Sequence, residues 1–336
     1  MANGARDGRP TMVSLARDLG VSRQTISNVL NNPDIVNERT RARVLAAIEE
    51  TGYRPSAIGR ALRTQRSMTI GLRLYRAVDG INGAIMDRFT HSLTESAQLH
   101  GYRLTLLSAE DAPTEVESLE ALHHVSAIDA AVLTDTFLDD PRPATLAARG
   151  LPFVAFGRPW GDPDAPHAWV DVDGRAGTLA ATTHLRQRGH TRIGFVGVDA
   201  SGVSADRREG WAAGMADSGV DAGGLQVLLA HDFARDGAEA AAVLRERGAT
   251  ALVCASDSLA LGAVGVFRNE SADIPVIGFD DTPVASAVGI SSVAQPVEEA
   301  AERIIAILLG LLAGDPPQRV LLEPTLVLRS LENFAS

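Results

Sequence analysis

The sequence predicts an α/β protein with two Rossmann-like subdomains, preceded by a small all-α module. Three observations lead to this fold class. The chain of 336 residues is longer than one ordinary hydrophobic core supports. Residues 11–63 read as short amphipathic helices, whereas from Met68 onward apolar strand-like segments alternate with helical ones. Alternation of that kind predicts parallel sheets with helices on both faces.

Residues 11–31 predict two short helices around a tight turn. The apolar residues before Gly20 fit one face of a helix, and those from Ile26 to Leu30 fit one face of a second. Gly20 ends the first helix, because glycine adopts a left-handed C-terminal conformation at little cost. Ser22 begins the second as an N-cap. The pattern is a helix-turn-helix, whose second helix enters the DNA major groove.

A third helix is expected, with Asn37 or a neighbour as its cap, an apolar stripe within Arg41–Glu50, and Gly52 after its end. A short further helix is expected over Ala57–Arg63, and the polar residues 1–10 are expected to be disordered. The alternative for this region is a plain three-helix bundle with no role in DNA binding.

Charge is distributed unevenly along the chain. The net charge of the chain is −11. Residues 1–66 carry eleven arginines and six acidic residues, whereas the remainder carries twenty arginines and thirty-six acidic residues. Contacts with phosphate would therefore come from the N-terminal module. The single cysteine, Cys254, excludes an internal disulfide framework and a multi-cysteine zinc site. Neither a signal peptide nor a membrane span is recognisable, so a cytoplasmic location is expected.

The α/β part divides into two successive series of elements. Predicted strands in the first series are 69–74, 102–107, 130–133 and 152–156, with helices over 84–100 and 113–126. Predicted strands in the second are 192–198, 226–229, 251–255 and 274–279, with helices over 174–188, 207–217, 237–247 and 258–268. Two series predict two subdomains with a cleft between them. Ligands of open α/β sheets bind at the carboxyl ends of the strands.

Three segments together resemble the headpiece of the lac repressor family of transcriptional regulators. They are Val13–Asn31, Asn37–Val44 and Gly52–Ser56, and the similarity continues to the C-terminus. The resemblance implies a headpiece at 11–54, a hinge helix and linker at 55–67, and an effector-binding and dimerisation domain at 68–336. This last domain is similar to periplasmic sugar-binding proteins. Its first subdomain would comprise about 68–160 and 296–322, and its second about 168–292 and 325–336. The chain would cross between them near 160–170, 291–295 and 322–325.

The resemblance also assigns candidate DNA contacts. Arg23, Gln24 and Asn28 occupy base-reading positions, and arginine pairs with guanine while glutamine or asparagine pairs with adenine. Positions that the family uses mainly for phosphate and sugar are occupied by Thr11, Ser22, Thr25, Asn31 and Tyr53. For Thr25 and Tyr53, core packing or capping is the alternative.

Leu62 matches the leucine that the family inserts between central base pairs in the minor groove. Gly59 lies in the same segment and costs about 0.5–1 kcal/mol relative to alanine in a helix. We therefore expect the hinge helix to form only on DNA. The alternative is that Leu62 is an ordinary linker residue.

The effector site that the resemblance implies lies at strand ends of the second subdomain. Arg207 would bind effector hydroxyls or carboxylates with its forked donors, and Asp280 would accept hydrogen bonds from a sugar diol. Ser256 replaces the family's usual asparagine, which puts a ligand contact there in doubt. The remaining candidates are Asp257, Gln295 and Asp139. The segment Phe156–Trp160 resembles sugar-responsive members and hints at a carbohydrate.

Other interpretations remain open for these residues. Arg207 and Asp280 could form a buried ion pair without a ligand, and Asp257 could be a helix cap. Neither a catalytic constellation, nor a metal-ligand pattern, nor a nucleotide-cofactor motif is found, so no enzyme, metal or cofactor is expected. We expect a homodimeric regulator that represses at a pseudopalindromic operator and is controlled by a small molecule, with a sugar as the expected class. Two alternative functions stay open: a solute-binding protein without a role in DNA binding, and a sugar-active enzyme, which would need a catalytic constellation that the sequence does not show.

Overall fold

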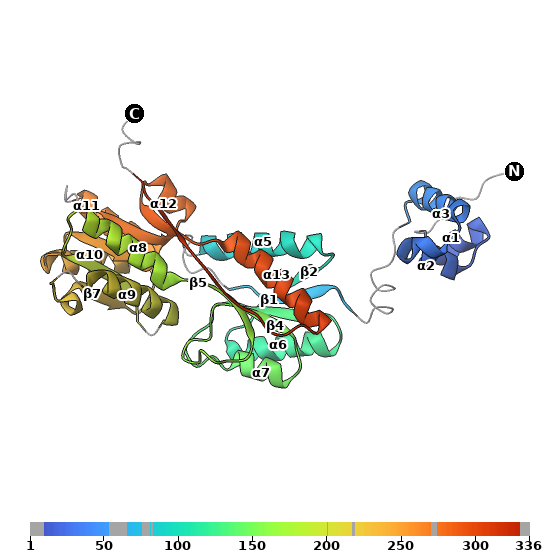
Figure 1. Ribbon diagram of the computed structural model, residues 1–336, viewed down its shortest axis with the longest axis horizontal. Helices are drawn as coiled ribbons and strands as arrows, with labels where there is room; N and C mark the ends of the chain where they lie inside the picture. Colours follow the sequence, from blue (N-terminus) through green and yellow to red (C-terminus); the bar gives the residue numbers. More distant parts are fainter. Residues whose placement is uncertain are drawn as a thin grey trace, which may run out of the picture. The chain divides into compact units, whose positions relative to one another are not determined.

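The computed structural model describes residues 10–53, 66–75, 81, 83–199, 201–216, 219–269 and 274–329. The chain forms two compact units, residues 1–67 and 68–336, and each is described by itself (Figure 1). The predicted hinge helix, Leu62 included, lies outside the described residues.

The N-terminal unit contains α1 (Met12–Leu19), α2 (Arg23–Asn31), the 3-10 helix η1 (Pro33–Ile35) and α3 (Glu38–Thr51). Gly20 has the predicted left-handed conformation with φ 63°, and Ser22 caps α2 by accepting a hydrogen bond from the Thr25 amide at 3.0 Å. Both predictions of the turn are therefore confirmed. The third helix begins at Glu38, directly after Asn37, whose side chain caps the amide of Arg39, so the predicted cap is confirmed.

A small apolar core holds the three helices together. It consists of Leu15, Ala16, Ile26, Val29, Val44 and Tyr53. Arg43 adds a link from α3 to α1, since its Nη2 donates to the Leu19 carbonyl at 3.0 Å. This bond satisfies a carbonyl at the end of α1 that has no partner within the helix.

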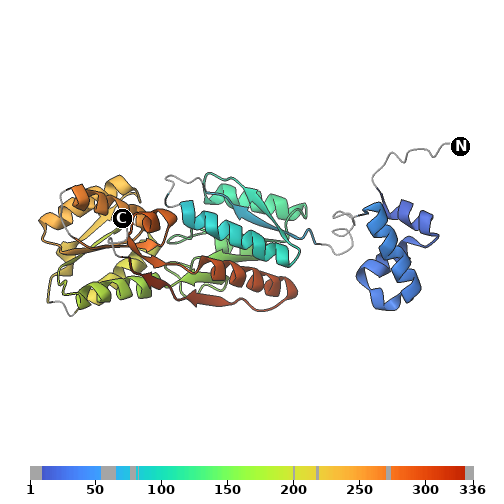
Figure 2. The ribbon, with the colours of Figure 1, turned by 90° about the horizontal axis from the view of Figure 1, so that it is seen from above.

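The first subdomain of the larger unit is built on a six-stranded parallel sheet of order β11-β5-β4-β3-β1-β2. Helices α5 and α13 pack side by side on one face, and α6 and α7 cover the other (Figures 1 and 2). The strands are β1 (Thr69–Arg73), β2 (Arg103–Leu107), β3 (Ala130–Leu133), β4 (Phe153–Phe156), β5 (Ala168–Val172) and β11 (Arg319–Leu322). The helices are α5 (Gly83–Leu99), α6 (Ala112–His124), α7 (Arg142–Ala148) and α13 (Val297–Ala313).

The second subdomain has a six-stranded sheet of order β12-β10-β9-β8-β6-β7, in which β12 runs antiparallel to β10. Its strands are β6 (Ile193–Val198), β7 (Gln226–Leu229), β8 (Ala251–Cys254), β9 (Val276–Asp280), β10 (Ser291–Ala294) and β12 (Thr325–Val327). Its helices are α8 (Gly174–Gln187), α9 (Gly202–Met215), η2 (Ala222–Leu225), α10 (Ala234–Glu246), α11 (Asp257–Asn269) and α12 (Pro283–Ala287). The fold class predicted from the sequence is confirmed: two α/β subdomains and an all-α helix-turn-helix module.

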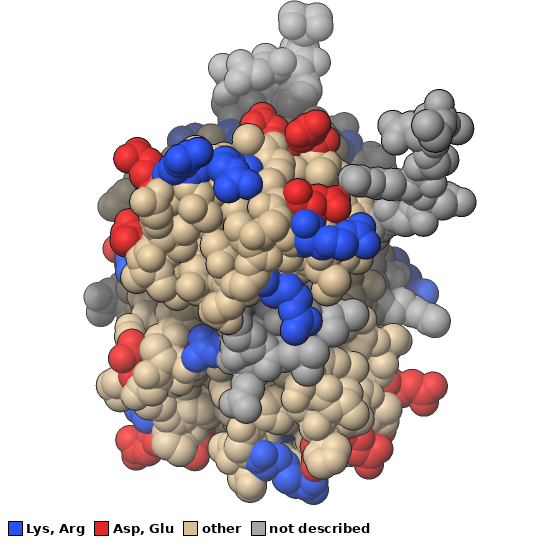
Figure 3. Space-filling view, turned by 90° about the vertical axis from the view of Figure 1, so that its right-hand side faces the viewer, with Lys and Arg blue, Asp and Glu red and all other residues tan. Residues whose placement is uncertain are grey.

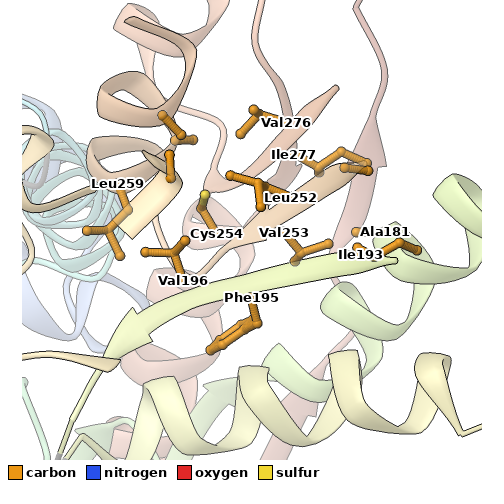
Figure 4. Close-up of a cluster of buried hydrophobic side chains, with 14 of the residues drawn as sticks. Ala181, Ile193, Phe195, Val196, Leu252, Val253, Cys254, Leu259, Val276 and Ile277 are labelled. Atoms are coloured by element: carbon orange, nitrogen blue, oxygen red, sulfur yellow. The ribbon is translucent and has the colours of Figure 1, made fainter. Parts of the chain in front are cut away.

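The core of the second subdomain lies between its sheet and the two layers of helices (Figure 4). Phe195 on β6 packs against Trp211 on α9, with ring centroids 5.5 Å apart. Close helix pairs need glycine at their contacts. A Cβ at Gly210 of α9 would lie 2.1 Å from the Arg175 carbonyl oxygen on α8, and one at Gly262 of α11 would lie 1.8 Å from that of Ala234 on α10.

The first crossing between subdomains differs from its prediction. Residues 168–172 were expected near the crossing and in the second subdomain, but they form β5, which pairs with β4 and β11 in the first sheet. The chain therefore crosses after Val172, directly before α8. The later crossings lie between β10 and α13 and between β11 and β12. Hydrogen bonding of β5 on both sides explains why its residues stay with the first sheet.

Candidate nucleic-acid interface and effector site

The start of α2 presents polar side chains to solvent. Arg23 and Gln24 are exposed and Asn28 is half-buried one turn on. Gln24 Nε2 donates to Asn28 Oδ1 at 2.9 Å, so the two amides lie on one face of the helix. Each amide keeps a free donor or acceptor group for a base edge. The structure thus places Gln24 and Asn28 on one face of α2, with Arg23 exposed at the start of the same helix.

Two of the predicted phosphate-contacting residues also cap helices. Thr11 Oγ1 accepts from the Ser14 amide at 3.1 Å, and the Ser14 hydroxyl accepts from the Thr11 amide at 2.9 Å. Ser22 caps α2, and its hydroxyl also hydrogen-bonds that of Thr25 at 2.9 Å. The N-termini of α1 and α2 carry unpaired amides and partial positive charge, which suits phosphate oxygens.

Tyr53 stands apart from this group. The Tyr53 ring is buried in the headpiece core with 5% exposure, and burial raises the pKa of its hydroxyl. This position favours the packing role over the phosphate contact implied by the resemblance. The Asn31 side chain lies outside the part of the chain that the structure describes.

The described body of the headpiece is electrically balanced. Residues 10–53 contain five arginines and five acidic residues, so the positive excess of residues 1–66 comes from the segments on either side. On the face that Figure 3 shows, arginines and carboxylates are interspersed. Attraction to phosphate would therefore depend more on the flanking arginines than on the helices.

Arg207 is the centre of the candidate effector site. It projects from α9, is 9% exposed, and its guanidinium lies 3.6 Å from the centroid of the Phe279 ring. Its Nη1 donates to the Ala255 carbonyl, and its Nη2 lies 3.7 Å from Asp280 Oδ1. Nε is buried and has no hydrogen-bond partner. The guanidinium is thus fixed by its surroundings while part of its donor capacity is unused.

Asp280 is the acidic partner at the end of β9. It has φ 108°, an unusual conformation for a non-glycine residue, and its Oδ1 accepts from Gln295 Nε2 at 2.6 Å. Burial raises the pKa of Asp280 to about 7, and the nearby Arg207 opposes this shift. The carboxyl group therefore changes charge near neutral pH. Its neighbour Asp281 pairs with Arg329 instead, at 2.6 Å, so the two adjacent acids face different partners.

Ser256 and Asp257 have internal roles. The Ser256 hydroxyl donates to Asp232, and it accepts from the Leu259 amide at 3.2 Å, which makes Ser256 the cap of α11. Asp257 accepts from the Thr282 amide at 2.7 Å and from the Ser292 hydroxyl at 2.6 Å. Asp257 is therefore not the helix cap considered above. Both of its carboxylate oxygens are engaged, and they join α11 to the residue that caps α12 and to strand β10.

Five of the six predicted effector residues gather in the second subdomain, and Asp139 does not. Asp139 is exposed in the connection between β3 and α7, where it lines a separate cavity of the first subdomain. Asp232 was missed, because no local pattern links it to Ser256, which is 24 residues away.

The sequence also did not predict a charged group that joins the two subdomains. Arg158 follows β4; its Nε donates to Asp171 at 2.6 Å and its Nη2 donates to Asp206 on α9 at 3.1 Å. Asp206 also accepts from the Arg175 amide at 3.0 Å. Arg158 lies within the segment Phe156–Trp160, whose likeness to sugar-responsive proteins was the one signal that could have drawn attention to it.

Arg142 organises the strand ends of the first subdomain. It is 1% exposed and donates to Glu115 at 2.7 Å, to Asp140 at 2.7 Å and to the Tyr75 hydroxyl at 2.9 Å. All of these groups have partners in the network, so they serve to fix the loops after β1 and β3.

The described residues offer neither a metal-binding cluster nor a membrane-spanning helix. Within the described ranges, no group of three histidine, cysteine or acidic residues is placed to hold a metal ion. In the same part of the chain no helix has both the length and the apolar character needed to cross a bilayer. Cys254 is fully buried, and burial raises the pKa of its thiol, so the thiol stays protonated.

Both the N-terminal module and the α/β domain are similar to known protein families. Residues 11–56 match the family described as bacterial regulatory proteins, lacI family, and residues 182–330 match a periplasmic binding protein-like domain. The chain is 33% identical to the HTH-type transcriptional regulator AglR of Rhizobium meliloti, over 94% of this chain and 92% of that protein. It is 31% identical to the transcriptional regulator GalR of Escherichia coli, over 95% and 94% of the two chains.

Solved structures agree with these matches. A complex of the transcriptional regulator CelR with cellobiose is similar with a TM-score of 0.70 and 28% identity, covering 96% of this chain and 99% of that one. The lac repressor dimer bound to operator shares the fold with a TM-score of 0.80 at 22% identity, covering 96% and 98%. Full-length similarity to named regulators, together with the helix-turn-helix and the two-subdomain domain, shows that this chain belongs to the lacI family of bacterial transcriptional regulators.

Proposed function

We propose that this regulator is a homodimeric repressor of a pseudopalindromic operator, and that a neutral sugar bound at Arg207, Asp280 and Gln295 controls its binding to DNA. A two-fold dimer presents two headpieces to two half-sites, so its operator repeats the same symmetry. Because the proposed partner is chromosomal DNA, we also propose a cytoplasmic location. The function rests on binding equilibria and requires no chemical step.

The observation that carries the sugar proposal is the composition of the buried cluster. Arg207 supplies donors in a fixed fork, Asp280 supplies acceptors, and the two are separated by 3.7 Å rather than joined by a close hydrogen bond. Adjacent hydroxyls of a sugar can accept from the first and donate to the second. The CelR structure, which holds cellobiose, supports a carbohydrate as the ligand class.

The proposed control works through the subdomains. A sugar that contacts both would bind better to one arrangement of the cleft and so shift the dimer between states with different operator affinity. The Arg158–Asp206 pair, which joins the first subdomain to α9, stabilises the arrangement seen here. Arg207 is the next residue of that helix, so the ligand site and the contact between subdomains share one rigid element.

The test begins with selection of duplexes from a random library by the full chain at fixed salt. We expect enrichment of a pseudopalindrome. Neutral sugars are then screened for a change in binding to that duplex, and fluorescence anisotropy of the labelled duplex measures the binding. Arg207→Ala should raise the half-effective sugar concentration about ten- to a hundredfold, the loss expected for hydrogen bonds to a charged group.

Arg208→Ala is the matched control, because Arg208 is the next residue on α9 and is outside the cluster. It should respond as the unaltered protein does. Enrichment of no sequence would contradict the operator proposal. A response of Arg207→Ala equal to that of Arg208→Ala would contradict the sugar site while leaving DNA binding in place.

A further inference from the structure

The first subdomain contains a large cavity that is separate from the proposed sugar site. It lies between α7 and the connection of residues 157–167 that joins β4 to β5, and has a volume of about 800 Å³. Every residue that lines it belongs to the first subdomain. Cavities of this size hold small organic ligands.

The walls of the cavity are mainly apolar. Phe137, Phe153 and Trp160 contribute aromatic rings, and Ala144 and Ala147 of α7 form the opposite side with several prolines. Trp160 is held from behind, because its ring lies against Gly202 of α9 and 4.9 Å from the Arg158 guanidinium. A flat apolar ring therefore finds a preformed space with aromatic surfaces on its sides.

The polar groups of the lining are rich in acceptors and poor in donors. Asp139 and Asp162 are exposed carboxylates, and Asp140 is already paired with Arg142. No arginine, asparagine or glutamine is among the described residues of the lining. The Thr136 hydroxyl donates to the Arg158 carbonyl, so it is also engaged. A ligand that reaches the carboxylates at the mouth must consequently supply the donors there.

His167 does not alter this balance. Its ring lies 5.5 Å from that of Phe153, and burial, followed by the charge of Arg319, lowers its pKa. The imidazole is therefore neutral at neutral pH and adds no positive charge. Both His167 Nε2 and Trp160 Nε1 are buried without hydrogen-bond partners, so the wall behind the aromatic rings holds one indole donor and one imidazole nitrogen, whereas the mouth holds carboxylates.

We infer that this cavity is a second ligand site, which takes a protonated amine carried on an aromatic or alicyclic ring. The ring would occupy the apolar body between Phe153 and α7, and the ammonium group would lie at the mouth near Asp139 and Asp162. A sugar would leave most of its hydroxyls against apolar walls, and an anion would meet the unpaired carboxylates of Asp139 and Asp162. The inference goes beyond the proposed sugar control and does not depend on it.

Tryptamine is a suitable probe, with indole-3-propionate and 3-ethylindole as anionic and neutral relatives of the same ring. Binding to the full chain is measured by saturation-transfer NMR and by calorimetry. We expect tryptamine to bind with Kd on the order of 0.1–1 mM, as the size of the molecule allows. It should bind at least tenfold more tightly than indole-3-propionate. Asp139→Asn with Asp162→Asn should weaken tryptamine at least fivefold and leave 3-ethylindole unchanged.

Ala147→Phe places a ring in the cavity from an exposed position on α7 and should abolish tryptamine binding. Ala148→Phe is the matched control, because Ala148 is equally exposed on the same helix but does not line the cavity. Equal binding by these two variants, or no binding to the unaltered protein, would overturn the inference. So would loss of tryptamine binding in Arg207→Ala, which would place the amine in the sugar site. A changed oligomeric state in Ala147→Phe alone would instead assign the cavity to contact with a second copy.

Discussion

Asp206 and Arg207, adjacent residues of α9, face opposite subdomains. Asp206 accepts from Arg158 of the first subdomain at 3.1 Å, whereas Arg207 lies 3.7 Å from Asp280 of the second. One turn of helix thus carries both the contact between subdomains and the central residue of the proposed sugar site. A small movement of Arg207 towards a ligand is transmitted to Asp206 without any flexible link, because a helix moves as a rigid element.

Asp206→Asn should lower the free energy of unfolding by about 1–3 kcal/mol. The side chains of Arg158 and Asp206 are only 22% and 10% exposed, so their attraction is screened less than that of a surface pair. Urea unfolding of the full chain measures the change. Glu299→Gln provides the control, since it breaks the exposed pair with Arg303 and should change stability by less than about 0.5 kcal/mol. Equal effects of both variants would show that the Arg158–Asp206 pair is no more than a surface contact.

Stability should depend on pH through Asp280. Its folded-state pKa is about 7, raised from the ordinary aspartate value of 3.8 mainly by burial. Between pH 4 and 7 the folded chain therefore retains a proton that the unfolded chain releases, and stability falls as pH rises through this window. Asp280→Asn removes this contribution. From pH 5 to pH 8 the unaltered protein should lose about 3 kcal/mol relative to the variant, at about 1.4 kcal/mol per pKa unit.

The measurement is urea unfolding of both proteins at pH 5, 6, 7 and 8. Other titrating groups contribute equally to the two, so they cancel in the difference. Parallel stability profiles would contradict the raised pKa of Asp280.

Features that depend on neighbouring residues were predictable from sequence. The left-handed Gly20 and the cap at Ser22 are each fixed by a residue type with one favoured local conformation. The alternation of strands and helices was visible because helix and strand have different apolar periods. Helix α13 was not assigned, although its buried residues between Val297 and Leu308 recur at helical spacing. Almost every residue from Ile304 to Ala313 is apolar, and this hides the periodicity in the sequence.

Features that depend on distant residues were not predictable. Asp139 was predicted to bind the effector, but it lines a different cavity in the first subdomain. Its position depends on how the 157–167 connection covers the sheet, which the sequence around Asp139 does not reveal. Arg158 and Asp206 are 48 residues apart, and only the packing of α9 beside the first crossing brings them together. Tyr53 illustrates the same point, since a tyrosine after a helix suits either a phosphate contact or the core, and tertiary packing decides between them.

Ser22→Ala should loosen α2 by removing the side-chain acceptor for the Thr25 amide. Loss of an N-cap costs about 1 kcal/mol, which corresponds to an approximately fivefold increase in local opening. Hydrogen exchange of residues 23–31 in the full chain reports this opening directly. Asn32→Ala is the control, because the Asn32 side chain makes no capping bond at the start of η1. Unchanged exchange in Ser22→Ala would indicate that core packing alone holds the helix.

Arg23→Ala should relax sequence preference at one base position in each half-site of the selected duplex. An arginine that pairs with guanine contributes about 1–3 kcal/mol of discrimination, whereas a phosphate contact weakens binding to all sequences alike. Arg23 is exposed at the start of α2 beside Gln24, which is the geometry that a base-reading residue requires. Repeating the selection with the variant distinguishes the two roles. Arg17→Ala is the matched control, since Arg17 is exposed in the last turn of α1 and is paired with Asp18. A uniform loss of affinity in Arg23→Ala, with an unchanged consensus and a smaller salt dependence, would reassign Arg23 to the phosphate backbone.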